Sequence, residues 1–149
     1  MPKIIAVNRQ ASHEYFLLDR YEAGLSLVGT EIKAIRQGNC NLKNSYVDIE
    51  NGEAFLKDMH IAEYDRGNRF NHETKRPRKL LLHKKEINRL AQKVKTDGLT
   101  IVPTSLYLHK GKAKVEIALA KGKKLYDKRQ SLKDKEVKRD LQQAVKNRY

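Results

Sequence analysis

The chain has few acidic residues, a single cysteine and no long apolar stretch. It contains 32 Lys and Arg but only 18 Asp and Glu in 149 residues, a formal net charge of +14. This imbalance favours a polyanionic partner, with nucleic acid ahead of an acidic membrane surface. Cys40 alone excludes an internal disulfide and favours a reducing cytoplasm. No stretch approaches the ~20 apolar residues of a transmembrane helix, and the first apolar run is too short for a secretion signal. We therefore expect a soluble, cytoplasmic protein that binds nucleic acid and no membrane.

Signals of an enzyme are also lacking. The five histidines show no metal-ligand spacing, and one cysteine cannot help to build a zinc site. The sequence has neither a phosphate-binding Gly-rich loop nor the G-x-S-x-G turn of serine hydrolases. His72 and Glu73 could form a nuclease pair, but a solvated polar loop is the favoured interpretation because nothing nearby would orient them. We expect no catalysis, no cofactor and no metal.

Local patterns in the first half of the chain predict one strand, one short helix and one hairpin. Residues 13–27 have a strand-like pattern in which Gly24 and Gly29 allow bends or bulges. A short helix is expected to begin at the N-cap Thr30 and to stop at Gly38, with Ile32 and Ile35 on one face. Asn51-Gly52 between two β-prone runs predicts a type I′ hairpin.

The second half of the chain is predicted to contain a longer helix and a second hairpin. Ile87, Leu90, Ala91 and Val94 at i, i+3, i+4, i+7 predict an amphipathic helix that Gly98 closes. A second hairpin is expected to turn at Lys110-Gly111, and Pro103 in its outgoing strand indicates an edge or a bulge. Its return strand places Val115, Ile117 and Leu119 on one face and Lys112, Lys114 and Glu116 on the other.

These elements predict a mainly β (α+β) fold. We expect a small antiparallel closed barrel of oligonucleotide-binding type with two or three helices, formed by residues 1–120. The basic segment over residues 65–79 is predicted to be an exposed loop, and its Phe70 could stack on a base. A merely solvated connection is the alternative. If the loop binds RNA, the candidate contacts are Arg69, Lys75, Arg76, Arg78 and Lys79.

The remaining residues, 121–149, form a basic C-terminal tail. They carry eleven basic and four acidic side chains, so this fifth of the chain holds +7 of the net charge. Val137, Leu141, Ala144 and Val145 fall at helical spacing, but the stripe is too narrow for a helix that is stable alone in water. We expect a tail that is disordered when free and becomes helical against a polyanionic partner.

Several stretches together resemble one family, small protein B (SmpB), the protein partner of transfer-messenger RNA (tmRNA) in bacterial ribosome rescue. They run in order over nearly the whole chain: "NRQASHEY", "YEAGLSLVGTEIKAIRQGNCNLKNSYVDIENGEAFL", "HIAEY", "RKLLLHKKEI", "TIVPTSLYL" and "KVEIALAKGKKLYDKR". The resemblance implies that the body grips the tRNA-like part of tmRNA and that the tail enters the empty mRNA channel of a stalled ribosome. It implies partnership with tmRNA and with the ribosome, and we expect a monomer.

The resemblance also implies site residues. The tmRNA contacts fall on Asn8, His13, Tyr15, Glu22, Leu81 and Lys114. Lys114 would pair with phosphate, whereas Glu22 would accept hydrogen bonds from a base or sugar or would orient a neighbouring cation. In the tail, the contacts with the decoding centre and mRNA channel fall on Gly122, Lys123, Lys124, Tyr126, Asp127, Lys128, Arg129, Lys133, Lys138 and Arg139. Ala144 and Val145 stand where some members carry bulkier apolar residues.

Two other functions remain open at this point. A ribosomal or ribosome-assembly protein would have the same charge and a similar barrel, and an RNA-processing enzyme is the third possibility. The RNA that co-purifies separates the first two functions, and turnover assays would reveal the third.

Overall fold

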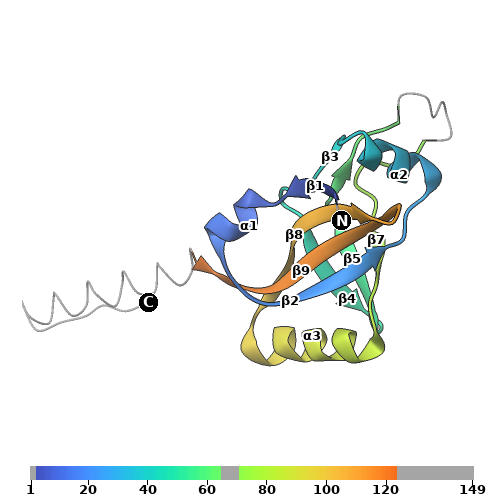
Figure 1. Cartoon of the computed structure of the whole chain (residues 1–149). Coiled ribbons are helices and arrows are strands. Elements are labelled where there is room, and N and C mark those ends of the chain that lie inside the picture. The colour runs from blue at the N-terminus through green and yellow to red at the C-terminus, as the bar shows by residue number, and fades with distance from the viewer. Residues whose placement is uncertain (1–2, 65–70, 124–149) are drawn as a thin grey trace, which may run out of the picture.

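One antiparallel sheet of seven strands organises the body. The computed structural model describes residues 3–64 and 71–123. The sheet order is β1-β8-β9-β2-β7-β5-β4, with a two-stranded pair of β3 and β6 beside it (Figure 1). The strands of the large sheet are, in that order, Lys3–Val7, Thr100–His109, Lys112–Gly122, Tyr15–Leu25, Arg78–Leu81, Glu53–Lys57 and Tyr46–Glu50; β3 is Cys40–Asn41 and β6 is His60–Ile61.

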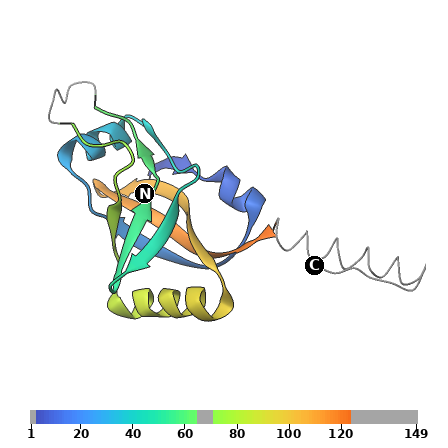
Figure 2. The same cartoon turned by 180° about the vertical axis from the view of Figure 1, so that it is seen from behind.

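Three helices accompany the sheet, namely α1 (Arg9–Glu14), α2 (Gly29–Arg36) and α3 (Lys84–Asp97). Figures 1 and 2 show α3 across one end of the curved sheet and α2 near the other end, with α1 beside the end of β9. The fold is mainly β with helices, as the sequence predicts. In the described part of the chain, the predicted closed barrel is not found.

The reason lies in the two edges of the sheet. β1 and β4 are the outermost strands, and no ladder joins them among the described residues. β4 comes close to β8, but no ladder joins these two strands among the described residues. β8 pairs with β9 along one edge, and β1 pairs with its other edge only from Ser105 to Leu108. The sheet therefore curves around its core without closing through hydrogen bonds.

Both predicted hairpins are confirmed. In the first, Glu50 pairs with Glu53, and the two turn residues Asn51 and Gly52 have φ of 52° and 78°. In the second, His109 pairs with Lys112 around Lys110 and Gly111, whose φ values are 52° and 77°. Positive φ at both central residues is the requirement of a type I′ turn, which matches the twist of the flanking strands.

The two longer helices are confirmed, with one shifted start. α3 buries Ile87 and Leu90 and ends at Gly98, which has φ of 65°. α2 ends as predicted before Gly38, with φ of 77°. It begins at Gly29, so the predicted N-cap at Thr30 is wrong: the Glu31 carboxylate accepts from the Val28 N–H (2.9 Å) and closes the first turn instead.

The N-terminal segment differs from the prediction. Residues 9–14 form α1, so His13 lies in a helix and the following strand begins only at Tyr15. Asn8 starts this helix: its Oδ1 accepts from the Ala11 N–H (3.2 Å), and its Nδ2 donates to the Pro103 carbonyl (2.8 Å). The predicted bend at Gly24 is also misplaced, because the register of β2 against β9 shifts between Leu17 and Arg20.

The core lies inside the curved sheet. Val115, Ile117 and Leu119 of β9 are buried on the predicted face. The predicted irregularity at Pro103 is confirmed as a bulge, since the register of β8 against β9 shifts between Pro103 and Ser105. A second, smaller cluster under α1 contains Ala11, Val102 and Ala120, which explains why β9 is apolar on both faces near its end.

Candidate RNA-binding surface

Four residues form one row across four neighbouring strands on the outer face of the sheet. Tyr107 on β8 is opposite Lys114 on β9, Lys114 is opposite Gly24 on β2, and Gly24 is opposite Leu81 on β7. Residues directly opposite one another point to the same face of a sheet. Leu81 is 56% exposed there. The register thus brings together two of the predicted RNA contacts, Leu81 and Lys114, with only a glycine between them.

Gly24 allows this close arrangement. A Cβ on Gly24 would lie 3.3 Å from both Cβ and Cδ1 of Leu81, so the Leu81 side chain occupies the space over the glycine. A groove of about 620 Å³ is lined by Glu22, Gly24, Leu81 and Lys114, together with residues at the start of α3. An adjoining, more apolar hollow of about 380 Å³ shares Gly24, Leu81 and Lys114. Three of the predicted tmRNA contacts therefore lie in one groove, which Lys79 of the predicted loop contacts also lines.

The adjacent row holds two carboxylates opposite each other, Glu22 on β2 and Glu116 on β9. Arg20 pairs with Glu116 (Nη1 to Oε2, 3.0 Å), and the Thr104 hydroxyl also donates to that carboxylate. The Tyr107 hydroxyl donates to Glu22. Partial burial and the nearby Glu22 carboxylate raise the pKa of Tyr107, so its hydroxyl stays protonated. Tyr107 is not among the contacts predicted from the sequence, although period-two alternation from the buried Leu106 places it on the outer face.

The other three predicted body contacts do not lie in this groove. Asn8 is buried and serves as the cap of α1, whereas His13 is exposed on that helix. Asn8 and Tyr15 line a separate hollow of about 250 Å³ with Tyr46, and none of its lining residues lines the groove. The structure therefore divides the predicted contacts between two places on the body.

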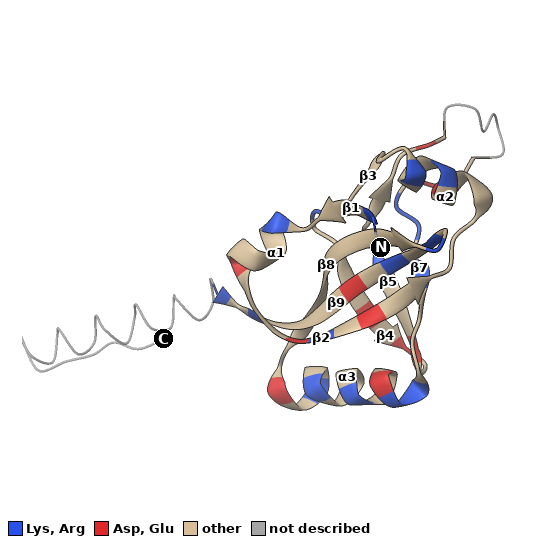
Figure 3. Ribbon diagram, viewed as in Figure 1, with Lys and Arg blue, Asp and Glu red and all other residues tan. Residues whose placement is uncertain are grey.

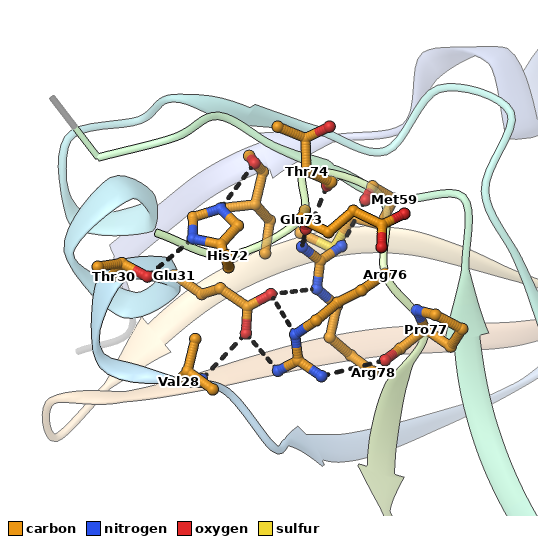
Figure 4. Close-up of polar contacts among 11 residues, drawn as sticks. Val28, Thr30, Glu31, Met59, His72, Glu73, Thr74, Arg76, Pro77 and Arg78 are labelled. Carbon is orange, nitrogen blue, oxygen red and sulfur yellow. Dashed lines mark hydrogen bonds and ion pairs between the residues drawn. The ribbon is translucent and has the colours of Figure 1, made fainter. Parts of the chain in front are cut away.

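The described part of the basic segment, residues 71–79, is partly packed into the fold. Glu31 and Arg78 have fully buried side chains, and Arg78 Nε donates to Glu31 Oε2 at 2.7 Å (Figure 4). Arg76 donates to the same carboxylate through Nε (3.0 Å) and Nη2 (2.5 Å). Burial alone would raise the pKa of Glu31, but the hydrogen bonds from Arg76, the Val28 N–H and Arg78 outweigh it and hold that pKa below its usual range.

Arg78 also binds backbone. Its guanidinium donates to the carbonyls of Met59 (2.5 Å) and Thr74 (3.1 Å), which fixes the segment on β6 and β7. His72 is buried as well and bonds to the Thr30 hydroxyl and the Ile61 carbonyl, each at 2.9 Å. The prediction of an exposed loop is wrong for His72 and Arg78, because both side chains are buried: His72 is hydrogen-bonded within the fold, and Arg78 is paired with Glu31.

The remaining basic residues predicted to contact RNA in this segment differ in how exposed their side chains are. Lys75 is exposed, and Lys79 is exposed but pairs with Glu53 at 2.7 Å. Arg69, with the neighbouring Phe70, lies outside the described residues. Of the predicted loop contacts that the structure describes, Lys75 and Lys79 present their ammonium groups at the surface, and Arg78 does not.

The root of the tail is attached to the body. β9 continues to Gly122, which is opposite Tyr15, so the last strand passes the predicted boundary by two residues. Lys123 Nζ donates to the Ser12 carbonyl (2.9 Å) and lies 5.3 Å from the centroid of the Phe16 ring. The other predicted tail contacts lie outside the described residues: Lys124, Tyr126, Asp127, Lys128, Arg129, Lys133, Lys138 and Arg139.

Charged residues are distributed over the whole described body. Figure 3 shows Lys and Arg on α2, on α3 and along β9 near its start, with Asp and Glu interspersed. Within residues 3–64 and 71–123, no group of three His, Cys, Asp or Glu side chains could hold a metal ion. None of the helices in these ranges combines the length and apolar character needed to cross a bilayer.

The chain matches the SmpB protein family over residues 5–147. It belongs to the SmpB family. The SsrA-binding protein of Carboxydothermus hydrogenoformans is 54% identical over 149 residues, which is the whole of both chains. That of Staphylococcus carnosus is 55% identical over 148 residues, 99% of this chain and 95% of the relative. A solved chain described as "tmRNA-SmpB: a journey to the center of the bacterial ribosome" is 46% identical, with a TM-score of 0.67 over 78% of this chain and 82% of that one.

Proposed function

We propose that this protein binds the tRNA-like domain of tmRNA and delivers it to stalled ribosomes that lack downstream mRNA, which enables trans-translation. Membership of the SmpB family and the names of its close relatives support this function. The observation that carries it is the groove across β9, β2 and β7, where Glu22, Leu81 and Lys114 meet. It offers a cation, an apolar side chain and a hydrogen-bond acceptor, the combination that a folded RNA with exposed bases requires.

Each side chain of the groove has a distinct role in this proposal. Lys114 has no ion-pair partner among the described residues, so its ammonium is available to a phosphate. Leu81 gives the apolar surface on which a ribose or base edge can rest. Lys75 and Lys79 extend the positive surface along the segment that Arg78 anchors. Binding alone accounts for the function, so we assign no catalytic step to the protein and propose that it acts in the cytoplasm as a monomer.

The curved sheet takes the place of the closed barrel in this proposal. An oligonucleotide-binding-type protein presents nucleic acid to one curved sheet face and its loops, and that use requires no closure between the edge strands. The row of Tyr107, Lys114, Gly24 and Leu81 lies on such a face. The RNA would therefore cross the strands of the sheet instead of running along one edge.

The tail is proposed to act in the mRNA channel. Its charge of +7 over residues 121–149 suits a channel lined by RNA, and its apolar spacing suits a helix that forms there. β9 carries Lys114 of the groove near its start and ends at Gly122, beside α1 (Figure 1), so the two predicted contact regions begin at different ends of this strand. The two RNA contacts could then be made at the same time.

The test is the affinity for tmRNA of two variants that lose the same charge. Lys114→Ala should weaken binding by about 1–2 kcal/mol, roughly 5- to 30-fold, and should reduce the salt slope by about one ion. Lys95→Ala, an exposed lysine near the far end of α3, is the matched control and should bind as the wild type does. With ~4–6 phosphate contacts, wild-type affinity should fall at least about 100-fold from about 50 to about 200 mM salt. Equal affinities of the two variants would remove Lys114 from the site.

Co-purification separates this function from that of a ribosomal or ribosome-assembly protein. The wild-type protein should enrich tmRNA over ribosomal RNA when it is recovered from cells, and Lys114→Ala should lose most of that enrichment while Lys95→Ala keeps it. Enrichment of ribosomal RNA alone would favour the assembly function.

A further inference from the structure

One side of helix α3 carries a row of basic side chains. Lys85, Arg89 and Lys93 follow one another at intervals of four residues, so they lie on the same side of the helix, about 6 Å apart along its axis. All three are exposed. The other side of α3 packs on the body through Ile87 and Leu90, which are buried. The helix therefore presents this basic stripe at the outside of the molecule, across one end of the sheet (Figures 1 and 3).

The basic stripe is only weakly paired within the protein. Lys85 and Arg89 have no ion pair with any of the described residues. Lys93 pairs with Asp97 at 3.5 Å, but both side chains are about half exposed, and such a pair contributes little to stability. The other acidic residue of the helix, Glu86, accepts from the backbone N–H of the residue before α3 (3.1 Å) and so caps the helix. The three cations can therefore bind an external anion without breaking a strong internal contact.

The composition of α3 indicates which anion fits. The helix contains no aromatic residue, so it has no ring on which an exposed base could stack. Ammonium and guanidinium groups bind phosphates without reading sequence. A helix that lies on an acidic membrane buries its apolar side in the lipid, whereas Ile87 and Leu90 are already in the core. The backbone of a base-paired RNA stem, with its bases hidden and its phosphates exposed, matches the stripe.

The position of α3 indicates which RNA comes within reach. The start of this helix forms part of the wall of the groove, through His83, Lys84, Glu86 and Ile87. The basic stripe begins at Lys85, in the same helical turn, and continues for about 12 Å along the axis to Lys93. An RNA that occupies the groove and extends past the start of α3 would therefore meet the stripe next.

We propose that the basic stripe binds the phosphate backbone of a base-paired stem of tmRNA, next to the nucleotides that the groove holds. This inference rests on the proposed function and goes beyond it, because it adds a contact outside the sheet face and assigns that contact to duplex RNA. The groove contacts exposed bases, and the stripe fixes the direction in which the adjoining stem leaves the body. The stripe adds affinity and orientation but no sequence selectivity.

The experiment measures Kd of the full-length protein for tmRNA over a range of salt concentrations. Lys85→Ala combined with Arg89→Ala should weaken binding about 5- to 30-fold at about 100 mM salt and lower the slope of log affinity against log salt by about 1.5–2, because two phosphate contacts are lost. The matched control, Lys33→Ala combined with Lys95→Ala, removes one exposed lysine from α2 and one from the flank of α3 beside β4, and should bind as the wild type does. Thermal unfolding checks that each variant is folded.

Hydroxyl-radical footprinting of tmRNA locates the contact. The wild-type protein should protect riboses in a base-paired stem as well as unpaired nucleotides. Lys85→Ala with Arg89→Ala should lose the protection of the stem only, whereas Lys114→Ala should lose protection of the unpaired nucleotides. The losses of affinity should be additive when all three substitutions are combined, because the stripe and the groove contact different parts of the RNA.

The possible outcomes separate this inference from the proposed function. A wild-type protein that does not prefer tmRNA over ribosomal RNA would contradict the proposed function itself. Where that preference is present, a wild-type Kd and salt slope in Lys85→Ala with Arg89→Ala would overturn the stripe as a tmRNA contact. Protection lost at unpaired nucleotides instead of a stem would overturn its assignment to duplex RNA. Normal tmRNA affinity with weakened binding to stalled ribosomes would overturn the proposal in favour of a contact with the ribosome.

Discussion

Replacing Glu31 with glutamine should cost more stability than any exposed charge of the body. The Glu31 carboxylate is fully buried and receives donors from Arg76, from Arg78 and from the Val28 N–H. Its partner Arg78 is fully buried too, and its guanidinium would remain charged inside the fold after the substitution. Breaking a buried pair by removing one partner typically costs ~3–5 kcal/mol, because an uncompensated charge stays behind. A loss of this size lowers the thermal midpoint by about 10 °C or more.

Urea unfolding at neutral pH, followed by circular dichroism, measures this loss. Glu53→Gln is the matched control, since it breaks the exposed pair with Lys79, where both side chains are about half exposed. An exposed pair contributes about 0–1 kcal/mol, so the control should remain close to the wild type. Arg78→Met combined with Glu31→Gln should recover part of the loss, because no buried charge then remains. A loss below about 1 kcal/mol for Glu31→Gln would refute the argument that the pair anchors this segment.

Three further predictions concern pH, the tail and the division of function. The pKa of Glu31 is lowered in the folded protein, so the stability that its ionised carboxylate contributes is fully present above the unfolded pKa of about 4.3 and is lost as pH falls through the folded pKa. In urea titrations, the difference in unfolding free energy between wild type and Glu31→Gln should therefore narrow below about pH 4. A difference that does not change with pH would exclude the ion pair as its source. Truncation after Lys124 keeps the Lys123 contact with Ser12 and should move the thermal midpoint by less than about 2 °C in calorimetry, whereas a large drop would mean that the tail packs on the body. Lys138→Pro would destabilise a helix in the tail by ~3 kcal/mol and leave the body unchanged. The affinity for tmRNA should therefore stay normal, whereas peptidyl transfer on ribosomes stalled without downstream message should be strongly impaired. Normal transfer would mean that the tail does not work as a helix.

Local sequence signals predicted the elements whose structure is decided locally. The turns at Asn51-Gly52 and at Lys110-Gly111 require positive φ, and the residues present tolerate it. Helix α3 follows from apolar spacing and a closing glycine. Helix α1 is different: it is short, and its cap Asn8 depends on a carbonyl 95 residues away in the chain. No local pattern reveals such a contact.

The same limit explains the two larger errors. Arg78 and Glu31 are 47 residues apart in sequence, so the charge of the basic segment could be counted but not its pairing. Closure of the sheet depends on whether the edge strand β4 forms a ladder with another strand once all strands are placed, and no such ladder is found among the described residues. For the groove, the family resemblance named Glu22, Leu81 and Lys114, but only the register shows that they meet and that Tyr107 holds Glu22.

Strand β9 sets a distance within the proposed function. Lys114 lies near its start and Gly122 at its end, eight positions further along, so about 26 Å separates the groove from the point where the tail begins. β2 and β8 pair with β9 on either side over this span, which restrains its length. The number of residues in β9 therefore determines the separation between the RNA held on the body and the start of the tail. The even separation of eight positions also places Lys114 and Gly122 on the same face of the sheet, so adding or removing one residue between them would turn one of the two positions to the opposite face.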